Sequence, residues 1–125
     1  MAWRSHGKDH EDLIRNLRSN GVITSDAVEK AMLMVDRGKY SKKNPYHDSP
    51  QSIGYGVNIS APHMHACSLT LLQDHLKKGN RALDVGKGGL SVGIDHFPEL
   101  VEQARENINN DSPELLKSGI VQLVG

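Results

Sequence analysis

The sequence predicts an α/β fold in which a helical N-terminal region precedes part of an open sheet. Apolar residues recur at helical spacing before about residue 80. Beyond that point, short apolar segments and one helical segment follow in the order strand, strand, helix, strand. The chain has 125 residues, 37% of them hydrophobic, which suits one domain with its own core. That core must be mainly aliphatic, because only 4% of the residues are aromatic.

Two helices are predicted near the N-terminus, over about residues 11–19 and 27–37. In front of the second helix, Asp26 and Glu29 have the spacing of a capping box, and Gly38 is a plausible stop. Both segments carry a stripe of apolar residues along one face. These faces comprise Leu13, Ile14 and Leu17 in the first helix, and Val28, Ala31, Met32 and Val35 in the second.

Residues 38–58 are predicted to be irregular, because they are rich in proline, glycine and polar side chains. A structureless stretch of about twenty residues inside a compact domain is unusual, and such loops are either disordered or functional. This one holds all of the tyrosines of the chain, which favours docking onto the rest of the protein over disorder. The tyrosines are Tyr40, Tyr46 and Tyr55.

A third helix is predicted to begin near Pro62, a favoured residue of the first helical turn, and to end at Gly79. His65 lies on its apolar face by spacing. Cys67 is expected to be a small buried hydrophobe. The leucines that continue the apolar face are Leu69, Leu72 and Leu76.

The C-terminal third is predicted to supply the sheet. Residues 82–86 and 90–94 are expected to be short strands, Pro98 opens a fourth helix, and residues 120–124 form a final strand. One further helical turn is expected to start at residues 112–113. The residues of the fourth helix that are expected to face inward are Val101, Ala104 and Ile108.

The composition argues against several functional classes. The 15 basic and 15 acidic side chains cancel, which argues against electrostatic binding of nucleic acid or of an anionic membrane. No apolar run approaches the roughly 18 residues of a membrane span, and residues 1–10 lack the apolar core of a signal peptide. The single cysteine excludes an internal disulfide framework and fits a reducing compartment. We therefore expect a soluble intracellular protein.

One glycine-rich stretch indicates a nucleotide site. Ala82-Leu-Asp-Val-Gly-Lys-Gly-Gly89 reads as a strand followed by a glycine loop, and Asp95 ends the next strand. Glycine lets the backbone approach a ligand closely, and an acid at that place can hold both ribose hydroxyls of a nucleoside. Taken alone, the stretch favours a glycine turn between two strands over a cofactor site.

Ser60, His63 and His65 stand beside the start of the third helix. They suggest an anion site or acyl transfer, but the local pattern favours a serine cap with His63 exposed and His65 half-buried. A metal site is disfavoured, because side chains two positions apart on a helix point about 200° apart. No metal is therefore expected.

Several longer motifs carry a close resemblance to one family. They are Asp36-Arg-Gly-Lys-Tyr40, Asn44-Pro-Tyr-His-Asp-Ser-Pro-Gln-Ser-Ile-Gly-Tyr55, Ile59-Ser-Ala-Pro-His-Met-His-Ala66, Ala82-Leu-Asp-Val-Gly86 and Gly93-Ile-Asp-His96. The stretches 48–54 and 59–65 are highly specific. Further matches are Met1-Ala-Trp-Arg-Ser5, Glu99-Leu-Val101 and Val121-Gln-Leu-Val124, so the resemblance extends over nearly the whole chain. On these residues the sequence resembles the animal form of the protein-L-isoaspartate O-methyltransferases.

The resemblance implies an incomplete, Rossmann-like S-adenosylmethionine-dependent methyltransferase fold. Residues 1–125 would form a single partial domain, with a helical and active-site segment over 1–79 and a truncated cofactor-binding α/β segment over 80–125. The family transfers a methyl group from S-adenosyl-L-methionine to the α-carboxylate of L-isoaspartyl residues in ageing proteins, which is a repair reaction. The resemblance further implies a cytoplasmic (cytosolic) monomer whose partners are isoaspartyl-containing proteins and peptides, with neither nucleic acid nor membrane.

The resemblance also implies the site residues. Ser60 matches the family's active-site serine, beside the isoaspartyl carboxylate and the methyl donor, which disfavours a Ser/His hydrolase. Asp95 matches the acid that holds the adenosine ribose. Because a sulfonium is a strong electrophile and a carboxylate an adequate nucleophile, the enzyme mainly has to position and desolvate the pair. The cofactor-site positions are Val57, Asn58, Ile59, Ser60, His65, Asp84, Val85, Gly86, Asp95, His96 and Glu102.

The chain departs from the family pattern in two places. Only residues 87–92 separate Gly86 from Gly93, so about fifteen residues of the usual βαβ crossover are missing. Because a parallel crossover needs about a dozen residues or more, we expect a hairpin-like turn at 86–89 or the loss of one strand from the sheet. The chain also ends near the middle of the family's domain. Both departures predict weak or absent catalysis, and the alternative is an inactive remnant that binds peptide or protein without methyl transfer.

Overall fold

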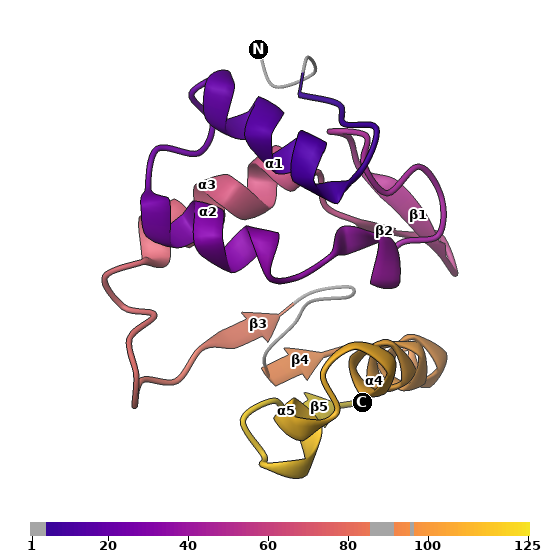
Figure 1. Cartoon of the computed structure of the whole chain (residues 1–125). Helices are drawn as coiled ribbons and strands as arrows, with labels where there is room; N and C mark the ends of the chain where they lie inside the picture. Colours follow the sequence, from indigo (N-terminus) through magenta and orange to yellow (C-terminus); the bar gives the residue numbers. More distant parts are fainter. Residues whose placement is uncertain (1–4, 86–91, 96) are drawn as a thin grey trace.

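The computed structural model describes residues 5–85, 92–95 and 97–125, and it arranges them in two layers (Figure 1). The N-terminal layer comprises α1 (His10–Ser19), α2 (Asp26–Leu33), the 3-10 helix η2 (Arg37–Lys39), β1 (Gln51–Gly54), β2 (Val57–Ile59) and α3 (Pro62–Leu72). The C-terminal layer comprises β3 (Leu83–Val85), β4 (Val92–Ile94), α4 (Pro98–Asp111), α5 (Glu114–Lys117) and β5 (Leu123–Val124).

The hydrophobic core of the N-terminal layer lies among its three α-helices. The predicted face of α1 is confirmed, since its three apolar residues are at most 1% exposed. The carboxylate of Asp9 accepts a hydrogen bond from the backbone N–H of Asp12 at 2.8 Å, which caps the helix. The residues of the core cluster are Leu13, Ile14, Leu17, Ile23, Val28 and Ala66.

Helix α2 is shorter than predicted, and its start differs by one residue. Ser25, rather than Asp26, is the N-cap and makes no side-chain cap bond, so the predicted capping box is wrong. Asp26 instead accepts a hydrogen bond from Arg18 of α1 at 2.6 Å. This ion pair ties the first turn of α2 to the end of α1. Of the predicted apolar stripe, Val28 is buried and Met32 half-buried, whereas Ala31 and Val35 are exposed.

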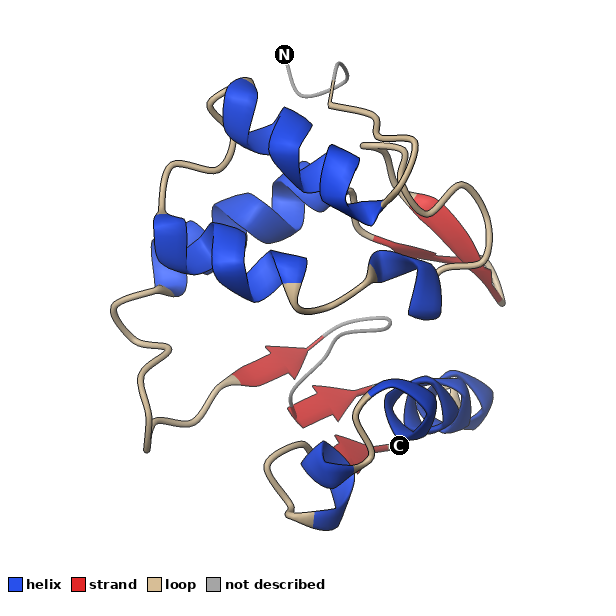
Figure 2. Ribbon diagram, viewed as in Figure 1, coloured by secondary structure: helices blue, strands red, loops and turns tan. Residues whose placement is uncertain are grey.

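The stretch predicted to be irregular contains an antiparallel hairpin of β1 and β2 (Figure 2). Gln51 pairs with Ile59, and a bulge interrupts the register before the turn. The turn residues Tyr55 and Gly56 have positive φ angles of 51° and 72°, as in a type I′ turn. The sequence signal was obscured because asparagine, aspartate or glycine usually takes the position that Tyr55 occupies.

The tyrosines dock as predicted. Tyr46 packs against the core cluster. The hydroxyl of Tyr40 donates a hydrogen bond to Asp111 at 2.6 Å, and the ring of Tyr55 stacks on Phe97 with centroids 6.0 Å apart. Two of the three tyrosines therefore connect the N-terminal layer with the C-terminal layer.

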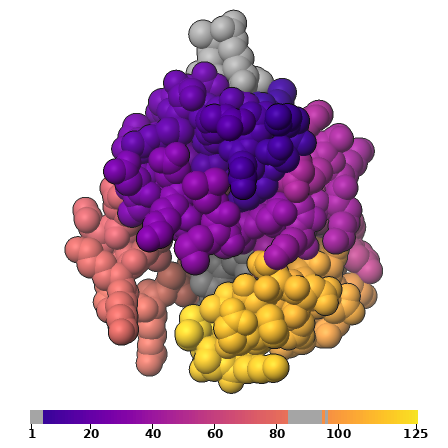
Figure 3. Space-filling view, in the orientation of Figure 1, coloured from indigo at the N-terminus to yellow at the C-terminus, as the bar shows by residue number. Residues whose placement is uncertain are grey.

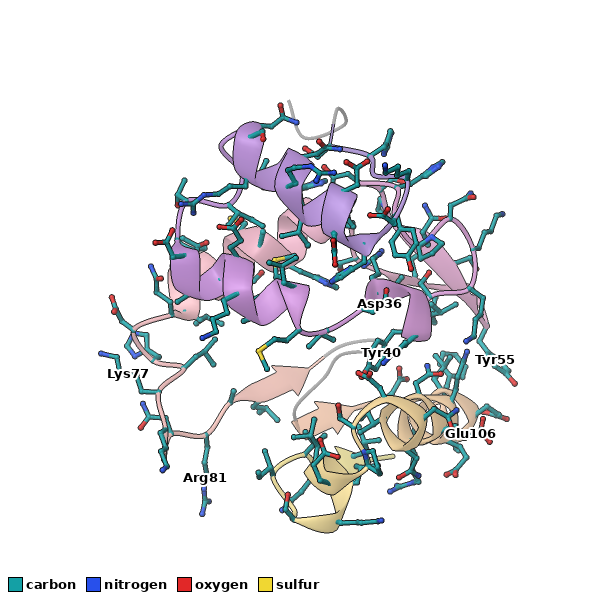
Figure 4. The ribbon with its side chains drawn as sticks, viewed as in Figure 1. Asp36, Tyr40, Tyr55, Lys77, Arg81 and Glu106 are labelled. Carbon is teal, nitrogen blue, oxygen red and sulfur yellow. The ribbon has the colours of Figure 1, made fainter. Side chains whose placement is uncertain are left out.

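Helix α3 ends at Leu72, several residues before the predicted end. Residues 71–81 are all exposed, and the labelled Lys77 and Arg81 point away from the protein (Figure 4). Helix α3 buries Pro62 and Ala66, and Leu69 packs half-buried against the core, as its predicted apolar face requires. The other side-chain predictions for this region are wrong: His65, Cys67, Leu72 and Leu76 are exposed, and His63 is half-buried.

The sheet of the C-terminal layer is parallel, in the order β3-β4-β5. Leu83 pairs with Val92 and Val85 with Ile94, so the predicted hairpin or strand loss is wrong. The rule of a dozen residues describes crossovers that carry a helix. Here the strands have three residues each, so the return from Val85 to Val92 spans only about 8 Å. Six residues, 86–91, lie between them in the sequence, and six extended residues reach roughly 20 Å.

Helix α4 covers this small sheet and confirms the predicted fourth helix. Leu100 and Ile108 are buried, while Val101 and Ala104 are half-buried. Helix α4 has 14 residues, and none of the helices described has the length and apolar character needed to cross a membrane.

The carboxylate of Asp111 joins the layers at the end of α4. It accepts hydrogen bonds from the ammonium of Lys39 and the hydroxyl of Tyr40, and its side chain is 7% exposed. Burial opposes ionisation of Asp111, but these two hydrogen bonds and the charge of Lys39 outweigh it, so the pKa of the carboxyl lies below its usual value. Burial, aided by the hydrogen bond to Asp111, raises the pKa of Tyr40 far above its usual value, so its hydroxyl stays a donor.

We expect truncation of the core to destabilise the protein strongly. Leu17→Ala removes a side chain that is 0% exposed and leaves a cavity, which should lower the free energy of unfolding by about 2–5 kcal/mol. Met34→Ala is the control, because Met34 is 76% exposed and its loss should change that energy by at most about 0.5 kcal/mol. Urea denaturation measures the free energy of unfolding of both variants. Equal losses in Leu17→Ala and Met34→Ala would show that Leu17 is not part of the core.

Asp111→Asn should lower stability at neutral pH, and its difference from the wild type should shrink below about pH 4. The folded pKa of Asp111 lies below the unfolded value of about 3.9. The ionised carboxylate therefore contributes stability above that value, and the contribution is lost as the pH falls through the folded pKa. Denaturation midpoints of the wild type and of Asp111→Asn, measured between about pH 7 and pH 3, test this pH dependence. A difference in midpoint that stayed constant over this range would contradict the role of the ionised carboxylate.

Candidate functional site

One half of the candidate site lies at the carboxyl edge of the parallel sheet. Asp84 and Val85 end β3, and Asp95 directly follows β4. Because Val85 pairs with Ile94, these chain segments leave adjacent strands at the same edge, where α/β folds bind their ligands. The predicted positions Gly86 and His96 lie outside the described residues.

Asp95 is buried at this edge, with 7% of its surface exposed. Its Oδ1 accepts a hydrogen bond from the backbone N–H of Phe97 at 3.0 Å, and its own N–H donates to the carbonyl of Val124 at 3.2 Å. These bonds hold the residue between β4, β5 and the start of α4. An acidic side chain is thus fixed where the sequence analysis expected one.

The other half of the candidate site is the strand β2 and the residue after it. Val57 is buried, Asn58 is exposed and Ile59 is half-buried, as the alternation of a strand requires. Ser60 follows and is exposed between β2 and α3. The predicted cofactor segment 57–60 therefore consists of the strand β2 and the exposed serine that follows it.

Asp48 anchors the start of α3 and was not predicted as a site residue. Its Oδ1 accepts hydrogen bonds from the backbone N–H of His63 at 2.9 Å and from the ring Nδ1 of His63 at 2.8 Å. The N-cap Ala61 has no side chain able to do so, so a carboxylate from a distant loop serves instead. Asp48 is 0% exposed and thereby holds the segment that begins at Ser60. No spacing rule links positions 48 and 63.

A buried arginine lies near Asp48. Arg37 of η2 is 7% exposed, and its Nε and Nη2 have no hydrogen-bond partner among the described residues, nor has Oδ2 of Asp48. Burial lowers the pKa of Arg37 to about 10, and the charge of Asp48 acts against that shift. Arg37 is therefore protonated at neutral pH, and the opposite charge of Asp48 offsets part of its desolvation cost.

Two predicted positions lie at the margin of this arrangement. His65 is exposed on α3. Glu102 is exposed on α4 and pairs with Arg105 of the same helix at 3.3 Å. Their contact with a cofactor stays a prediction. In the described ranges, no three or more histidines, cysteines or acids are grouped in a way that could hold a metal ion.

The ring contact between Tyr55 and Phe97 connects the two halves of the site. The ring planes are inclined by 27° with centroids 6.0 Å apart, which is a stacked arrangement. Tyr55 lies two residues before Val57, and Phe97 lies two residues after Asp95. The hairpin turn that precedes the segment 57–60 therefore contacts the residue two positions after the buried acid.

Comparisons with known proteins identify the family. A family model for protein-L-isoaspartate(D-aspartate) O-methyltransferases matches residues 8–124. The chain belongs to this family. The resemblance inferred from the sequence is thereby confirmed.

Individual relatives agree with this assignment. A protein-L-isoaspartate O-methyltransferase of Caenorhabditis elegans is 45% identical over 99% of this chain and 62% of its own length. Protein-L-isoaspartate O-methyltransferase 1 of Arabidopsis thaliana is 44% identical over 90% of this chain and 57% of its own length. The chain thus spans about six-tenths of the length of these relatives.

A solved structure supports the fold. A putative protein-L-isoaspartate O-methyltransferase from Plasmodium falciparum, in complex with S-adenosyl-L-homocysteine, is 41% identical and superposes with a TM-score of 0.88. The match covers 94% of this chain and 62% of that one. The predicted incomplete Rossmann-like methyltransferase fold is therefore confirmed.

The alignment with the nematode relative also reveals a difference in size. It runs over 139 positions, whereas this chain has 125 residues, so at least 14 positions lack a counterpart here. That number is close to the gap of about fifteen residues expected between Gly86 and Gly93 from the βαβ pattern.

Removal of the Asp48 carboxylate should loosen the start of α3. We expect Asp48→Ala to lower the free energy of unfolding by about 1–3 kcal/mol, because His63 loses both hydrogen bonds to a buried acceptor. Asp48→Asn should cost less, since its amide oxygen still accepts from the backbone. Asp74→Ala is the matched control, because Asp74 is an exposed carboxylate on the connection after α3. Denaturation and amide exchange at His63 measure the effect; unchanged exchange in Asp48→Ala would contradict this role.

Proposed function

We propose that this chain binds S-adenosyl-L-methionine and methylates the carboxylate of L-isoaspartyl residues in damaged proteins. The observation that carries the proposal is its likeness to the Plasmodium falciparum protein in complex with S-adenosyl-L-homocysteine, at a TM-score of 0.88. Family membership over residues 8–124 supports the reaction class. Because the chain spans about six-tenths of its relatives, the activity itself has to be measured.

The described residues fit such a cofactor. Asp95 offers a buried carboxylate at the carboxyl edge of a parallel sheet, where an acid holds the ribose hydroxyls of a nucleoside. Asp84 and Val85 end the adjacent strand. The segment 57–60 belongs to the other layer, and the stacked rings of Tyr55 and Phe97 link the turn before it to the residue that follows Asp95 by two positions. Gly86, His65, His96 and Glu102 complete the proposed set of cofactor positions.

The proposed reaction mainly requires that the methyl donor and the substrate carboxylate be held in the right relative position. S-adenosyl-L-methionine, when bound, supplies a methyl group on a sulfonium centre, which is already a strong electrophile. The exposed hydroxyl of Ser60 is proposed to hold the isoaspartyl carboxylate by a hydrogen bond. Asp48, through His63, holds the backbone that carries Ser60. No protein acid or base has to move a proton, because the substrate carboxylate is ionised at neutral pH.

The proposed partners follow from the same reading. They are proteins and peptides that contain isoaspartyl residues, and the protein is proposed to act as a cytoplasmic monomer without nucleic acid or membrane. The balanced charge, with 15 basic and 15 acidic side chains, supports the exclusion of polyanionic partners.

The positions missing from the alignment support a second candidate. At least 14 positions of the nematode relative have no counterpart in this chain. If they belong to the cofactor-binding crossover, the chain would bind peptides through residues 48–65 without methyl transfer.

Calorimetric titration with S-adenosyl-L-homocysteine, followed by a methyl-transfer assay, tests both candidates. We expect saturable binding by the wild type. Asp95→Asn should raise the dissociation constant by about ten- to a hundredfold, because the ribose loses a charged acceptor, while the amide oxygen still accepts from Phe97. Asp74→Asn, an exposed carboxylate on the connection between the layers, is the matched control.

The assay supplies radiolabelled S-adenosyl-L-methionine and compares an isoaspartyl peptide with its aspartyl twin. Methylation of the isoaspartyl peptide alone would establish the proposed activity. Cofactor binding, or peptide binding, without methyl transfer would favour the second candidate. Absence of any cofactor binding by the wild type would overturn the proposed function.

A further inference from the structure

The connection between the two layers does not by itself set their relative position. Residues 71–81 are exposed throughout (Figure 3 shows this segment standing off the main body). Its hydrogen bonds join near neighbours in the sequence, such as those from the backbone N–H groups of His75 and Leu76 to the carbonyl of Leu72. An exposed segment with local bonds transmits little orientation. The layers are therefore placed by contacts between side chains.

Helix α4 makes such contacts at both of its ends. At its start, the N-cap Phe97 stacks on Tyr55 of the hairpin turn. At its last residue, Asp111 accepts hydrogen bonds from Lys39 and Tyr40 around η2. Figure 4 shows Tyr40 between η2 and α4. A helix of 14 residues separates these two points by about 20 Å, so the pair fixes its direction as well as its position.

The first of these contacts adjoins the proposed cofactor site. The N–H of Phe97 is bound to Oδ1 of Asp95, so a movement of Phe97 moves the acid. Tyr55 is joined to Val57 through a single glycine, so the partner ring moves with the strand segment 57–60. The second contact, at Asp111, keeps α4 from pivoting about the first.

We propose that the docking of α4 at its two ends positions Asp95 opposite the segment 57–60, and that Asp111, Tyr40 and Tyr55 are positioning residues for the cofactor. This inference rests on the proposed function. None of the three has to touch the cofactor. Asp111 is suited to the role because its ionised side chain is 7% exposed and satisfied by two donors from the other layer.

The affinity for S-adenosyl-L-homocysteine measures positioning. Asp111→Asn should raise the dissociation constant about tenfold, the cost of one hydrogen bond to a charged group, and Tyr40→Phe should act in the same direction. Tyr55→Leu should weaken binding of S-adenosyl-L-homocysteine, whereas Tyr55→Phe keeps the ring and should bind it with wild-type affinity. Asp12→Asn is the matched control, because Asp12 pairs with Arg15 inside α1 and joins no layers.

A distance measurement tests the docking without any ligand. The native Cys67 is exposed on α3, and Glu106 is exposed on α4, so Glu106→Cys provides a second labelling position in the other layer. Spin labels at both positions should give a narrow distance distribution in the otherwise unchanged protein. Adding Asp111→Asn should broaden it, and adding Asp12→Asn should not. Circular dichroism confirms that each variant is folded.

The two measurements separate the two claims. A wild type that fails to bind S-adenosyl-L-homocysteine would overturn the proposed function, while the label distances would still decide whether α4 is docked by Asp111. An unchanged distance distribution in Asp111→Asn would overturn the docking. Broadened distances with unchanged cofactor affinity would overturn the positioning role and leave Asp111 a purely structural residue.

Discussion

The hydrogen bonds between Asp111 and the pair Lys39 and Tyr40 join residues more than 70 positions apart, and they connect the two layers of the structure. The core cluster lies wholly within the N-terminal layer, so it cannot hold the sheet in place. Leu100 and Ile108 of α4 are buried but do not belong to that cluster. Polar and aromatic contacts at the ends of α4 therefore connect the two layers, as a shared hydrophobic core does in a larger α/β domain.

Within the N-terminal layer, buried charge has a comparable role. Asp48 replaces a local helix cap at α3, and Arg37 brings a second buried charge towards it. Such groups are costly to bury unless they are paired and hydrogen-bonded. The hydrogen bonds of Asp48 to His63 hold the start of α3, which directly follows the segment that contains Ser60. The proposed chemistry, which relies on positioning rather than on proton transfer, requires that this segment be held in place.

Regular elements with a complete apolar face were predictable from the sequence. Helices α1 and α4 and the order of the strands follow the expected pattern, because burial of a periodic face is a local property of the sequence. The early end of α3 was not predictable, since Leu72 and Leu76 continue the apolar pattern but stay 49% and 44% exposed. The hairpin was missed because Tyr55 takes a positive φ that its residue type disfavours. The parallel pairing of β3 with β4 differs from the expected hairpin, because strands of only three residues leave a short distance for the chain to return over.

The sequence by itself determined the family, the aliphatic core of the helices and the chain positions of the candidate site, because each depends on residues that lie close together in the chain. Only the tertiary structure decided which side chains bring those positions together. Asp48 meets His63, Tyr55 meets Phe97, and Asp111 meets Tyr40 across gaps that no periodicity spans. Such contacts depend on how the layers pack, and a hydrogen bond or ring contact between distant segments leaves no regular spacing in the chain from which it could be predicted.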